Sequence, residues 1–321
     1  MELTQTRMIF YPILATVAVP ANLLVILILL RGKCGLALCI TCYLVAMASA
    51  DLTVILTDVI LKQIIPLYST DPIAENITLC GLIDCLTHAA TDLTVWFTVA
   101  FTFDRFVAIC CQKLKTKYCT WRTAVVIIGT VTILSCLKNI PWYYRYDPVY
   151  LFFIPLFCMV KFSYYTSPLW KTFSLFHSLT TPLLPFVLIA FLNALTVRNI
   201  LLASKARRRL RGQGDKENQN DPEMENRRKS ILLLFSISAS FILLWMTQAV
   251  YTIHERITLN HIIDRLLKNR LPFVIGYIGP MLQLLSSCSN TCIYVVTQSK
   301  FREDLKNVLI YPFLLVQLLV K

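Results

Sequence analysis

Seven long apolar runs occupy most of the chain and limit what it can fold into. A run of about 20 apolar residues crosses the roughly 30 Å hydrocarbon core of a bilayer as a helix, and a helix satisfies its own backbone hydrogen bonds where lipid cannot. The runs cover residues 8–30, 35–61, 80–111, 124–144, 169–203, 230–253 and 271–297. We therefore expect an all-α fold in which residues 1–321 form one seven-transmembrane helix bundle.

The composition favours a membrane protein over an enzyme. Of the 321 residues, 56% are hydrophobic and only 15% are charged, which is more apolar than soluble domains are. The runs leave no room for a separate soluble domain. The sequence lacks a P-loop, a nucleophile elbow, an HExxH motif and a cluster of metal ligands, so enzymatic chemistry is disfavoured.

The distribution of basic residues predicts the orientation. Of the 31 Lys and Arg residues, 19 lie in the segments that are cytoplasmic if the N-terminus is outside. This bias indicates an extracellular N-terminus and a cytoplasmic C-terminus in a multi-pass protein of the plasma membrane. The net charge of +13 then reflects this bias and not nucleic-acid binding. The basic stretch Arg207 to Arg211 fits a patch near anionic lipid, and a cytoplasmic partner there is compatible with it.

Two cysteines are placed to form a disulfide on the external side. Most of the twelve cysteines lie within the spans or on the cytoplasmic side. Cys80 starts the third span and Cys158 lies in the long external segment before the fifth, so a bridge between them is the economical expectation in an oxidising compartment. Cys85, one turn deeper, is expected to be a buried thiol. Asn76 begins a glycosylation sequon in an external loop.

Acidic residues inside the spans mark function or buried pairing, because charges are costly in lipid. There are five of them, namely Asp51, Asp58, Asp84, Asp92 and Asp104. Asp51 and Asp58 are two helical turns apart and share a face. Asp84, Thr87, His88 and Thr91 follow helical spacing along the third span. Both stripes are expected to face the bundle interior.

Asp104 and Arg105 form an adjacent pair at the end of the third span. From Cys80 to Arg105 the helix is roughly 37 Å long, so the pair reaches the inner membrane surface if Cys80 is at the outer one. One interpretation is a snorkelling anchor. The other is a functional pair, and it is favoured by matching features in the neighbouring spans.

Short motifs occur in order along the spans. They are Pro20-Ala21-Asn22, the stretch from Leu44 to Asp51, Cys80, Asp104-Arg105-Phe106, Pro185, Phe241 with Trp245, and Asn290 to Tyr294. Together they resemble the rhodopsin-like (class A) G-protein-coupled receptors over essentially the whole chain. Finer features, such as Trp96 to Val99 and Asn139 to Tyr144, are similar to the orphan branch related to the tryptophan- and phenylalanine-sensing receptors. Phe301 begins what resembles the family's short amphipathic eighth helix, at about residues 299–309.

The resemblance implies a receptor that binds an extracellular small molecule or peptide in the outer half of the bundle and activates heterotrimeric G proteins. It assigns the coupling switch to Asp104, Arg105, Phe106, Pro185, Phe241, Trp245, Asn290 and Tyr294. It also implies a mid-bundle polar cluster of Asn22, Asp51, Thr94, Ser286, Ser287 and Asn290. In this family such a cluster often holds a sodium ion, and the alternative is a water-filled network without an ion.

The expected ligand pocket is lined by Asp58, Asp84, Thr87, His88, Thr91, Trp245, Gln248, Thr252 and Gln283. Thr87 stands where amine receptors carry an aspartate, which makes a biogenic amine unexpected. Gln248 stands where the aromatic-amino-acid sensors carry arginine, which weakens that ligand class. Asp58 and Asp84 favour a cationic ligand group, unless Lys62 satisfies one of them internally. His88 fits a hydrogen-bonded pocket wall better than a metal ligand.

The sequence departs from the family at Thr247 and Thr291, which replace prolines of the sixth and seventh helices. Arg227, at the foot of the sixth helix, stands where many relatives carry an acid that holds the third-helix arginine. We expect Arg227 to repel Arg105 and to allow basal signalling. A chemosensory receptor of the same fold, or an ion- or proton-coupled transporter, remains as an alternative. The repeats that many transporters show are absent from the sequence.

Overall fold

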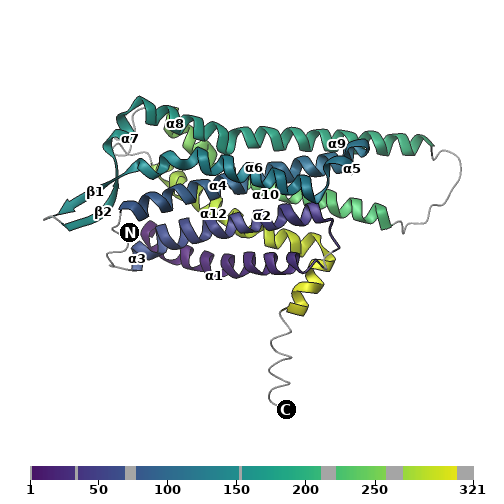
Figure 1. Cartoon of the computed structure of the whole chain (residues 1–321), viewed down its shortest axis with the longest axis horizontal. Coiled ribbons are helices and arrows are strands. Elements are labelled where there is room, and N and C mark those ends of the chain that lie inside the picture. Colours follow the sequence, from purple (N-terminus) through teal and green to yellow (C-terminus); the bar gives the residue numbers. More distant parts are fainter. Residues whose placement is uncertain are drawn as a thin grey trace, which may run out of the picture.

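The chain forms a bundle of long helices in the computed structural model (Figure 1), which describes residues 2–32, 35–68, 77–151, 154–210, 222–257 and 270–308. Within these residues, six helical stretches are long and apolar enough to cross a membrane. They are 5–30, 38–64, 77–110, 121–145, 168–205 and 228–253. The seventh helix of the bundle is α12 (Arg270–Thr297). The predicted all-α seven-helix fold is confirmed.

Several spans are built from more than one helical segment. The second span joins α2 (Leu38–Val54), the π-helical η1 (Ile55–Ile64) and α3 (Ile65–Tyr68). The fourth span joins α6 (Trp121–Asn139) to η3 (Ile140–Arg145). The first, third and sixth spans are single helices, namely α1 (Glu2–Leu30), α4 (Ile77–Cys110) and α10 (Pro222–Ile257). The connections contain α5 (Gln112–Tyr118) and α7 (Phe162–Thr166).

The fifth span is bent where it crosses the bundle. It consists of α8 (Pro168–Ser178), η4 (Leu179–Leu183) and α9 (Leu184–Leu210). Thr181 has a φ of −150° and a ψ of 102°, which are not helical angles. The next residue is Pro182, and proline disfavours the α conformation in the residue before it. By contrast α10, which carries Thr247 where relatives carry proline, is a single helix of 36 residues.

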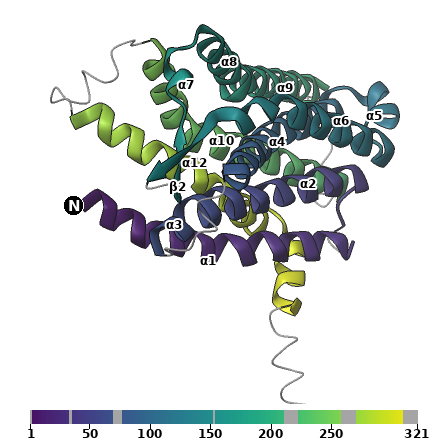
Figure 2. The same ribbon diagram turned by 60° about the vertical axis from the view of Figure 1, so that its left-hand side comes forward.

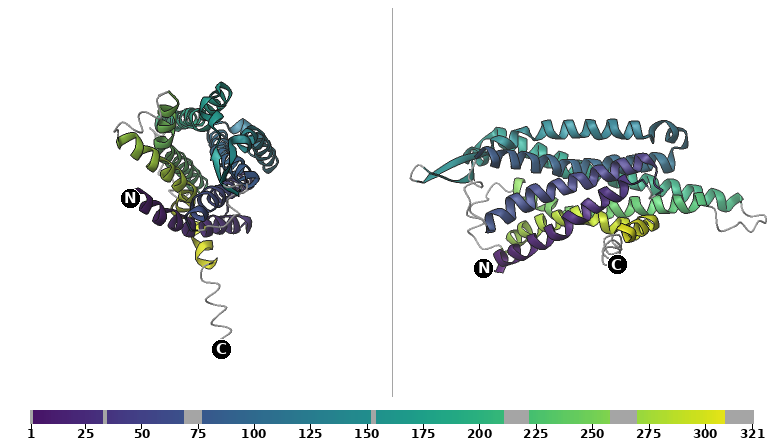
Figure 3. Two further views of the ribbon diagram at one scale, coloured as in Figure 1. Left: turned by 90° about the vertical axis from the view of Figure 1, so that its left-hand side faces the viewer. Right: turned by 60° about the horizontal axis from the view of Figure 1, so that its bottom comes forward.

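The helices pack inward on large side chains and leave an apolar outer surface. Viewed along the bundle axis, the helices are arranged side by side around a common interior (Figure 3), and α4 packs against α2, α6, α9 and α10. The largest core cluster contains fully buried Tyr43, Phe101, Tyr294 and Phe301. In the fourth span (121–145) and in the fifth (168–205), only 17% of the most apolar stretch of 18 residues is buried inside the bundle. This exposed apolar surface is what lipid contact requires of a membrane-spanning helix.

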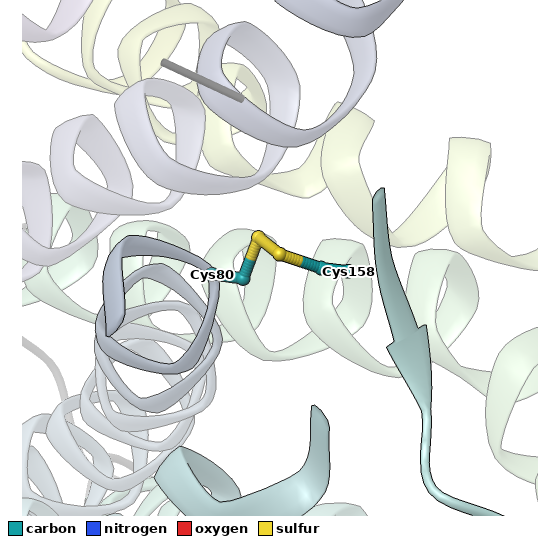
Figure 4. Close-up of a disulfide and its surroundings, with 2 residues drawn as sticks. All are labelled: Cys80 and Cys158. Atoms are coloured by element: carbon teal, nitrogen blue, oxygen red, sulfur yellow. A yellow bond between two sulfur atoms is a disulfide. The ribbon is translucent and has the colours of Figure 1, made fainter. Parts of the chain in front are cut away.

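A β-hairpin projects from one end of the bundle (Figure 1). Strand β1 (Tyr146–Leu151) pairs antiparallel with β2 (Ile154–Val160), and Tyr146 faces Val160 in the register. Cys158 of β2 is bonded to Cys80 at the start of α4 (Figure 4). The predicted disulfide is therefore confirmed, whereas the hairpin was not predicted. Asn76 of the predicted sequon lies outside the described residues.

The bundle has two ends, the disulfide end and the Arg105 end. The disulfide end carries the hairpin, the start of α4 and the N-terminal end of α1 (Figures 1 and 2). The Arg105 end carries α5 and the start of α10 (Figure 1). After α12, residues 299–308 form a short helix that turns away from the bundle axis (Figure 1). The Arg302 guanidinium donates to the carbonyls of Val295 and Val296, both at 3.0 Å, and so caps the C-terminus of α12.

Candidate functional site

Arg105 is neutralised by its neighbour Asp104 at the end of α4. Arg105 Nε donates to Asp104 Oδ2 at 3.0 Å, and Arg105 Nη2 also contacts that oxygen. Both side chains are buried, so the pairing removes most of the cost of two charges in a low-dielectric site. Two further contacts reach other helices: Arg105 Nη1 lies 3.5 Å from Ser230 Oγ of α10, and Nη2 lies 3.7 Å from Cys39 Sγ of α2.

A cavity of about 760 Å³ opens beside Arg105. It is bounded by the turn after α1, the start of α2, the end of α4 with α5, the start of α10, and residues 298–300. The lining residues are Gly35, Leu36, Ala37, Cys39, Ile40, Arg105, Ala108, Ile109, Gln112, Lys115, Thr116, Cys119, Lys229, Ser230, Leu233, Gln298, Ser299 and Lys300. Arg105 is therefore positioned where a partner that enters this end would meet it.

Two other expected switch residues, Tyr294 and Phe106, are described by the structure, whereas the side chain of Arg227 is not. Tyr294 is buried, packs on Phe301 with 5.9 Å between ring centroids, and its hydroxyl has no hydrogen-bond partner among the described residues. Phe106 is half-buried and lies 6.4 Å from Phe103, ring to ring. Arg227 lies in α10, but its side chain is outside what the structure describes, so the predicted repulsion of Arg105 stays a prediction.

The predicted mid-bundle cluster assembles around Asp51. Asn290 Nδ2 donates to Asp51 Oδ2 at 2.9 Å, and the Ser287 side chain also bonds to Asp51. Asn22 Nδ2 donates to the Ser287 carbonyl at 2.8 Å, which connects α1 to the cluster. The Asn22 Oδ1 atom is buried and has no partner among the described residues. The Asp51 carboxylate thus joins α2 to α12, and the Ser287 carbonyl joins α12 to α1.

Thr94 and Ser286, the other expected members of the cluster, have different hydrogen bonds. Thr94 Oγ1 donates to carbonyls of its own helix, those of Ala90 and Thr91. Ser286 Oγ accepts from Trp245 Nε1 at 2.9 Å. Ser286 therefore connects α12 to the expected switch tryptophan of α10.

The aromatic side chains of the sixth span pack against the fifth. Phe241 lies 5.2 Å from Trp245 and 5.4 Å from Phe186, measured between ring centroids. Phe186 directly follows Pro185, which is buried in the first turn of α9. A shift of Trp245 would therefore be felt both at Ser286 and along α9.

Asp84 is neutralised internally at the disulfide end. Lys62 Nζ lies 2.6 Å from Asp84 Oδ1, and Arg145 Nη1 lies 3.4 Å from Asp84 Oδ2. The Asp84 side chain is fully buried. Of the two alternatives that the sequence left open, the internal pairing by Lys62 is therefore the one that the structure shows for Asp84. Asp58 accepts a hydrogen bond from the side chain of Gln63.

An aromatic cluster, centred on Trp142, packs beside Asp84. The rings of His88 and Trp142 are stacked with centroids 4.0 Å apart, and His177 lies edge-on to Trp142 at 5.4 Å. Trp170 and Phe173 complete the cluster. His88 Nδ1 is 2.8 Å from the Asp84 carbonyl. Among the described residues no group of three His, Cys, Asp or Glu side chains could hold a metal ion.

The remaining expected pocket residues lie on three helices. Thr87 Oγ1 donates to the Ile83 carbonyl at 2.7 Å, and Thr91 is half-buried one turn further along α4. On α10, Thr252 Oγ1 donates to the Gln248 carbonyl at 2.9 Å. On α12, the Gln283 carbonyl accepts from Ser286 at 2.6 Å. The Gln248 Oε1 atom is buried without a partner among the described residues.

A buried network around Asp92 was not assigned a site from the sequence. Asp92 Oδ2 lies 2.6 Å from Lys138 Nζ and 2.5 Å from Asn139 Nδ2, and Asp92 Oδ1 accepts from Thr181 Oγ1 at 2.5 Å. His177 lies 3.7 Å from the same carboxylate. The network joins α4, α6 and the bend in the fifth span. Its only sequence signal was that Asp92 and Lys138 are both charged residues within apolar runs.

Long helices that place their charged side chains inside the bundle, and that present apolar side chains outward, define a multi-pass membrane protein of the seven-helix class. Residues 21–294 match the family model described as 7 transmembrane receptor (rhodopsin family). The chain belongs to this family. It is therefore a receptor of the G-protein-coupled type.

Proposed function

We propose that this receptor activates heterotrimeric G proteins through the cavity at the Arg105 end. The observation that carries the proposal is the position of Arg105 on the cavity wall, held by Asp104 and by two weak contacts to α2 and α10. Outward movement of α10 would remove Ser230 from Arg105 and widen the cavity. Arg105 would then be free to meet the partner.

The ligand site is proposed at the disulfide end, where the Asp84 pairs and the Trp142 cluster line the interior. A ligand shifts the receptor only if it binds one packing of the bundle more tightly than the other. The hydrogen bond between Trp245 of α10 and Ser286 of α12 supplies a coupling route, because both helices carry residues of the expected pocket. Ligand contacts that move Trp245 would therefore bias α10.

Internal pairing narrows the class of ligand. A cationic ligand group at Asp84 would have to displace Lys62 or Arg145 from a buried carboxylate, which costs the ligand affinity. We therefore favour a small molecule or peptide that reaches the pocket through aromatic contacts and hydrogen bonds. We also propose that the receptor belongs to the orphan branch related to the tryptophan- and phenylalanine-sensing receptors, from which it differs by carrying Gln248 where those sensors carry arginine.

The proposed orientation puts the disulfide end outside the cell and the Arg105 end in the cytoplasm. It is supported by the excess of Lys and Arg at the Arg105 end and by a disulfide at the opposite end, since disulfides persist in oxidising compartments. The receptor would then lie in the plasma membrane with its N-terminus extracellular.

A sodium ion is proposed at Asp51. The donors gathered there are a carboxylate, a hydroxyl and an amide, and hard oxygen ligands of this kind suit a hard cation. The buried Asn22 Oδ1, which has no hydrogen-bond partner within the described part of the chain, is a further oxygen in the same cluster. Asp51 would supply the charge, and Ser287 and Asn290 would orient it. Replacement of sodium by choline should lower the melting temperature of the purified receptor, and Asp51→Asn should abolish that difference.

The test of the proposed function compares two arginines of the same end. Resonance energy transfer between the receptor and each class of Gα subunit is measured in cells for the unchanged receptor, for Arg105→Ala and for Arg122→Ala. Arg122 is exposed at the start of α6 and serves as the matched control. We expect a basal signal that Arg105→Ala removes and Arg122→Ala keeps.

Two outcomes would contradict the proposal. One is the absence of a signal above mock-transfected cells for every Gα class, with normal surface expression. The other is an ion current or substrate uptake that survives Arg105→Ala, which would favour a transporter.

A further inference from the structure

The cavity beside Arg105 is open to solvent and lined by basic side chains. Four of its lining residues are cations, namely Arg105, Lys115, Lys229 and Lys300. None of the described lining residues is an acid. Asp104 compensates Arg105, whereas within the described residues no carboxylate forms an ion pair with Lys115 or Lys300. The cavity wall therefore carries excess positive charge.

The lysines approach the cavity from three different segments. Lys115 belongs to α5, Lys229 to the start of α10, and Lys300 to the short helix 299–308. The position of Lys300 is set by Gly35, which has a φ of 65°. A Cβ atom on Gly35 would lie 2.7 Å from Lys300 Nζ, so the ammonium group rests against the turn between α1 and α2, although the Lys300 side chain as a whole is exposed.

Neutral hydrogen-bonding side chains line the cavity wall between these cations. Lys229 Nζ lies 3.5 Å from Ser299 Oγ, and Gln112, Thr116 and Ser230 also line the cavity. The Arg302 N–H donates to the Gln298 carbonyl at 3.2 Å, so helix 299–308 begins at the cavity wall. The amides of its first turn have no intrahelical acceptor, and the helix dipole favours an anion at this end.

We propose that this cavity binds a phosphate-bearing anion, held by Lys115, Lys229 and Lys300. Several cations with hydroxyl and amide donors between them match a group that carries more than one negative charge and several acceptor oxygens. A phosphomonoester has this chemistry and a single carboxylate does not. The volume of about 760 Å³ admits a polyol bearing several phosphates. The source is either a soluble phosphate ester or the headgroup of a phosphorylated lipid in the adjoining leaflet.

The bound anion would also regulate the receptor, and this half of the proposal rests on the proposed G-protein coupling. Lys229 lies on α10, whereas Lys115 and Lys300 lie on segments outside it. An anion that bridges them holds the start of α10 in place and occupies the space that the G protein needs. Occupancy should therefore favour the resting packing and lower basal signalling.

The binding test uses the purified full-length receptor and two probes. Inositol hexakisphosphate, added to receptor in detergent, represents the soluble source. Phosphatidylcholine nanodiscs with a minor fraction of phosphatidylinositol bisphosphate represent the lipid source, with phosphatidylserine at equal total charge as the comparison. Affinity is measured for Lys115→Gln, Lys229→Gln and Lys300→Gln, singly and combined. We expect each substitution to weaken binding about tenfold, since a charge-assisted hydrogen bond contributes at least the equivalent of that factor.

A matched triple variant separates a built site from general attraction to basic protein. Lys113 and Lys117 of α5 and Lys306 of helix 299–308 are exposed, as Lys115 and Lys300 are, but they do not line the cavity. Combined Lys113→Gln, Lys117→Gln and Lys306→Gln removes the same charge and should leave affinity within about twofold, because these ammonium groups do not line the cavity and cannot donate charge-assisted hydrogen bonds to an anion inside it. Gly35→Ala changes no charge but displaces Lys300, and it should also weaken binding.

The outcomes decide between the sources and against the proposal. Binding of the soluble probe, or binding of the phosphoinositide alone, supports the site and names its source. Equal losses in the two triple variants, or no binding of either probe by receptor with a normal melting temperature, would overturn it. Loss of binding without higher basal signalling overturns the regulatory half only. A receptor that binds the anion but engages no G protein refutes the proposed coupling and leaves the site standing.

Discussion

Asp92 of α4 and Lys138 of α6 form an ion pair in the bundle interior, with 2.6 Å between Oδ2 and Nζ. The carboxylate is fully buried and also accepts hydrogen bonds from Asn139 and Thr181. Lys138 in turn donates to Thr180 and Thr181 at 3.2 and 3.0 Å. One acid thereby connects three spans, and the bend in the fifth span is the part that it holds.

The Asp92 network predicts an unequal effect of single and double substitutions. Lys138→Met leaves a buried carboxylate without its cation and should cost about 3–5 kcal/mol of stability. Adding Asp92→Asn removes the charge and keeps an amide that still bonds to Thr181 and Asn139, so much of the loss should be recovered. The measurement is thermal unfolding of receptor in detergent. A double variant that is less stable than Lys138→Met would contradict the pairing.

The two cations at Asp84 predict cooperative behaviour. Lys62→Met leaves Arg145 at Asp84, and Arg145→Met leaves Lys62, so each single change should cost about 1–3 kcal/mol. With both cations removed the buried carboxylate has no charged partner, and the loss should exceed the sum of the two. A double-mutant cycle on thermal stability measures this coupling. Strict additivity would contradict the prediction, because it would mean that the two cations do not compensate for one another at Asp84.

Two helical glycines predict opposite responses to the same change. A Cβ atom on Gly81 of α4 would lie 2.5 Å from the Tyr143 carbonyl oxygen, whereas one on Gly129 of α6 would meet nothing within 4 Å. Gly81→Ala should therefore cost about 1–3 kcal/mol through overpacking. Gly129→Ala should be neutral or stabilising by up to about 1 kcal/mol through helix propensity. Equal melting temperatures for the two variants would refute the close approach of α4 to η3.

Cys119 predicts a pH-dependent reactivity at the Arg105 end. Burial, with a smaller contribution from Asp104, raises the pKa of the Cys119 thiol to about 12. A raised pKa means that the reactive thiolate of Cys119 is scarce at neutral pH. The alkylation rate of an ordinary cysteine levels off above its pKa of about 8.5. The rate for Cys119 should instead keep rising beyond that pH, about tenfold per pH unit. Alkylation of Cys119 followed by mass spectrometry from neutral to alkaline pH tests this. A plateau near the ordinary cysteine pKa would be the contrary result.

Features that depend on one segment were predictable from the sequence. The apolar runs gave the spans, because a bilayer imposes a length and a composition on each of them separately. The disulfide followed from two cysteines near the same membrane face. The contact between Asp104 and Arg105 needs only their adjacency. Each of these requires no knowledge of which helix packs against which.

Features that depend on the packing of several helices were not predictable in the same way. Asp92 meets Lys138, Thr181 and His177 only because three spans converge, and nothing in their spacing along the chain indicates it. His88 and His177 come within 5.6 Å, ring to ring, from spans 89 positions apart in the sequence. Lys62 was recognised as one possible partner of Asp84, but Arg145 arrives from the segment that leads into an unpredicted hairpin.

The buried acids of α4 have a consequence for how the protein enters the membrane. An aspartate near the centre of a span costs about 2.5–3.5 kcal/mol on insertion, and α4 is the least apolar of the six candidate spans. Lys62, the partner of Asp84, is synthesised before α4, but Lys138, the partner of Asp92, is synthesised after it. When α4 reaches the translocon, the cation that pairs with Asp84 has therefore been synthesised, whereas the cation that pairs with Asp92 has not. Stable integration of α4 therefore requires α6, and the third and fourth spans enter the membrane as one unit.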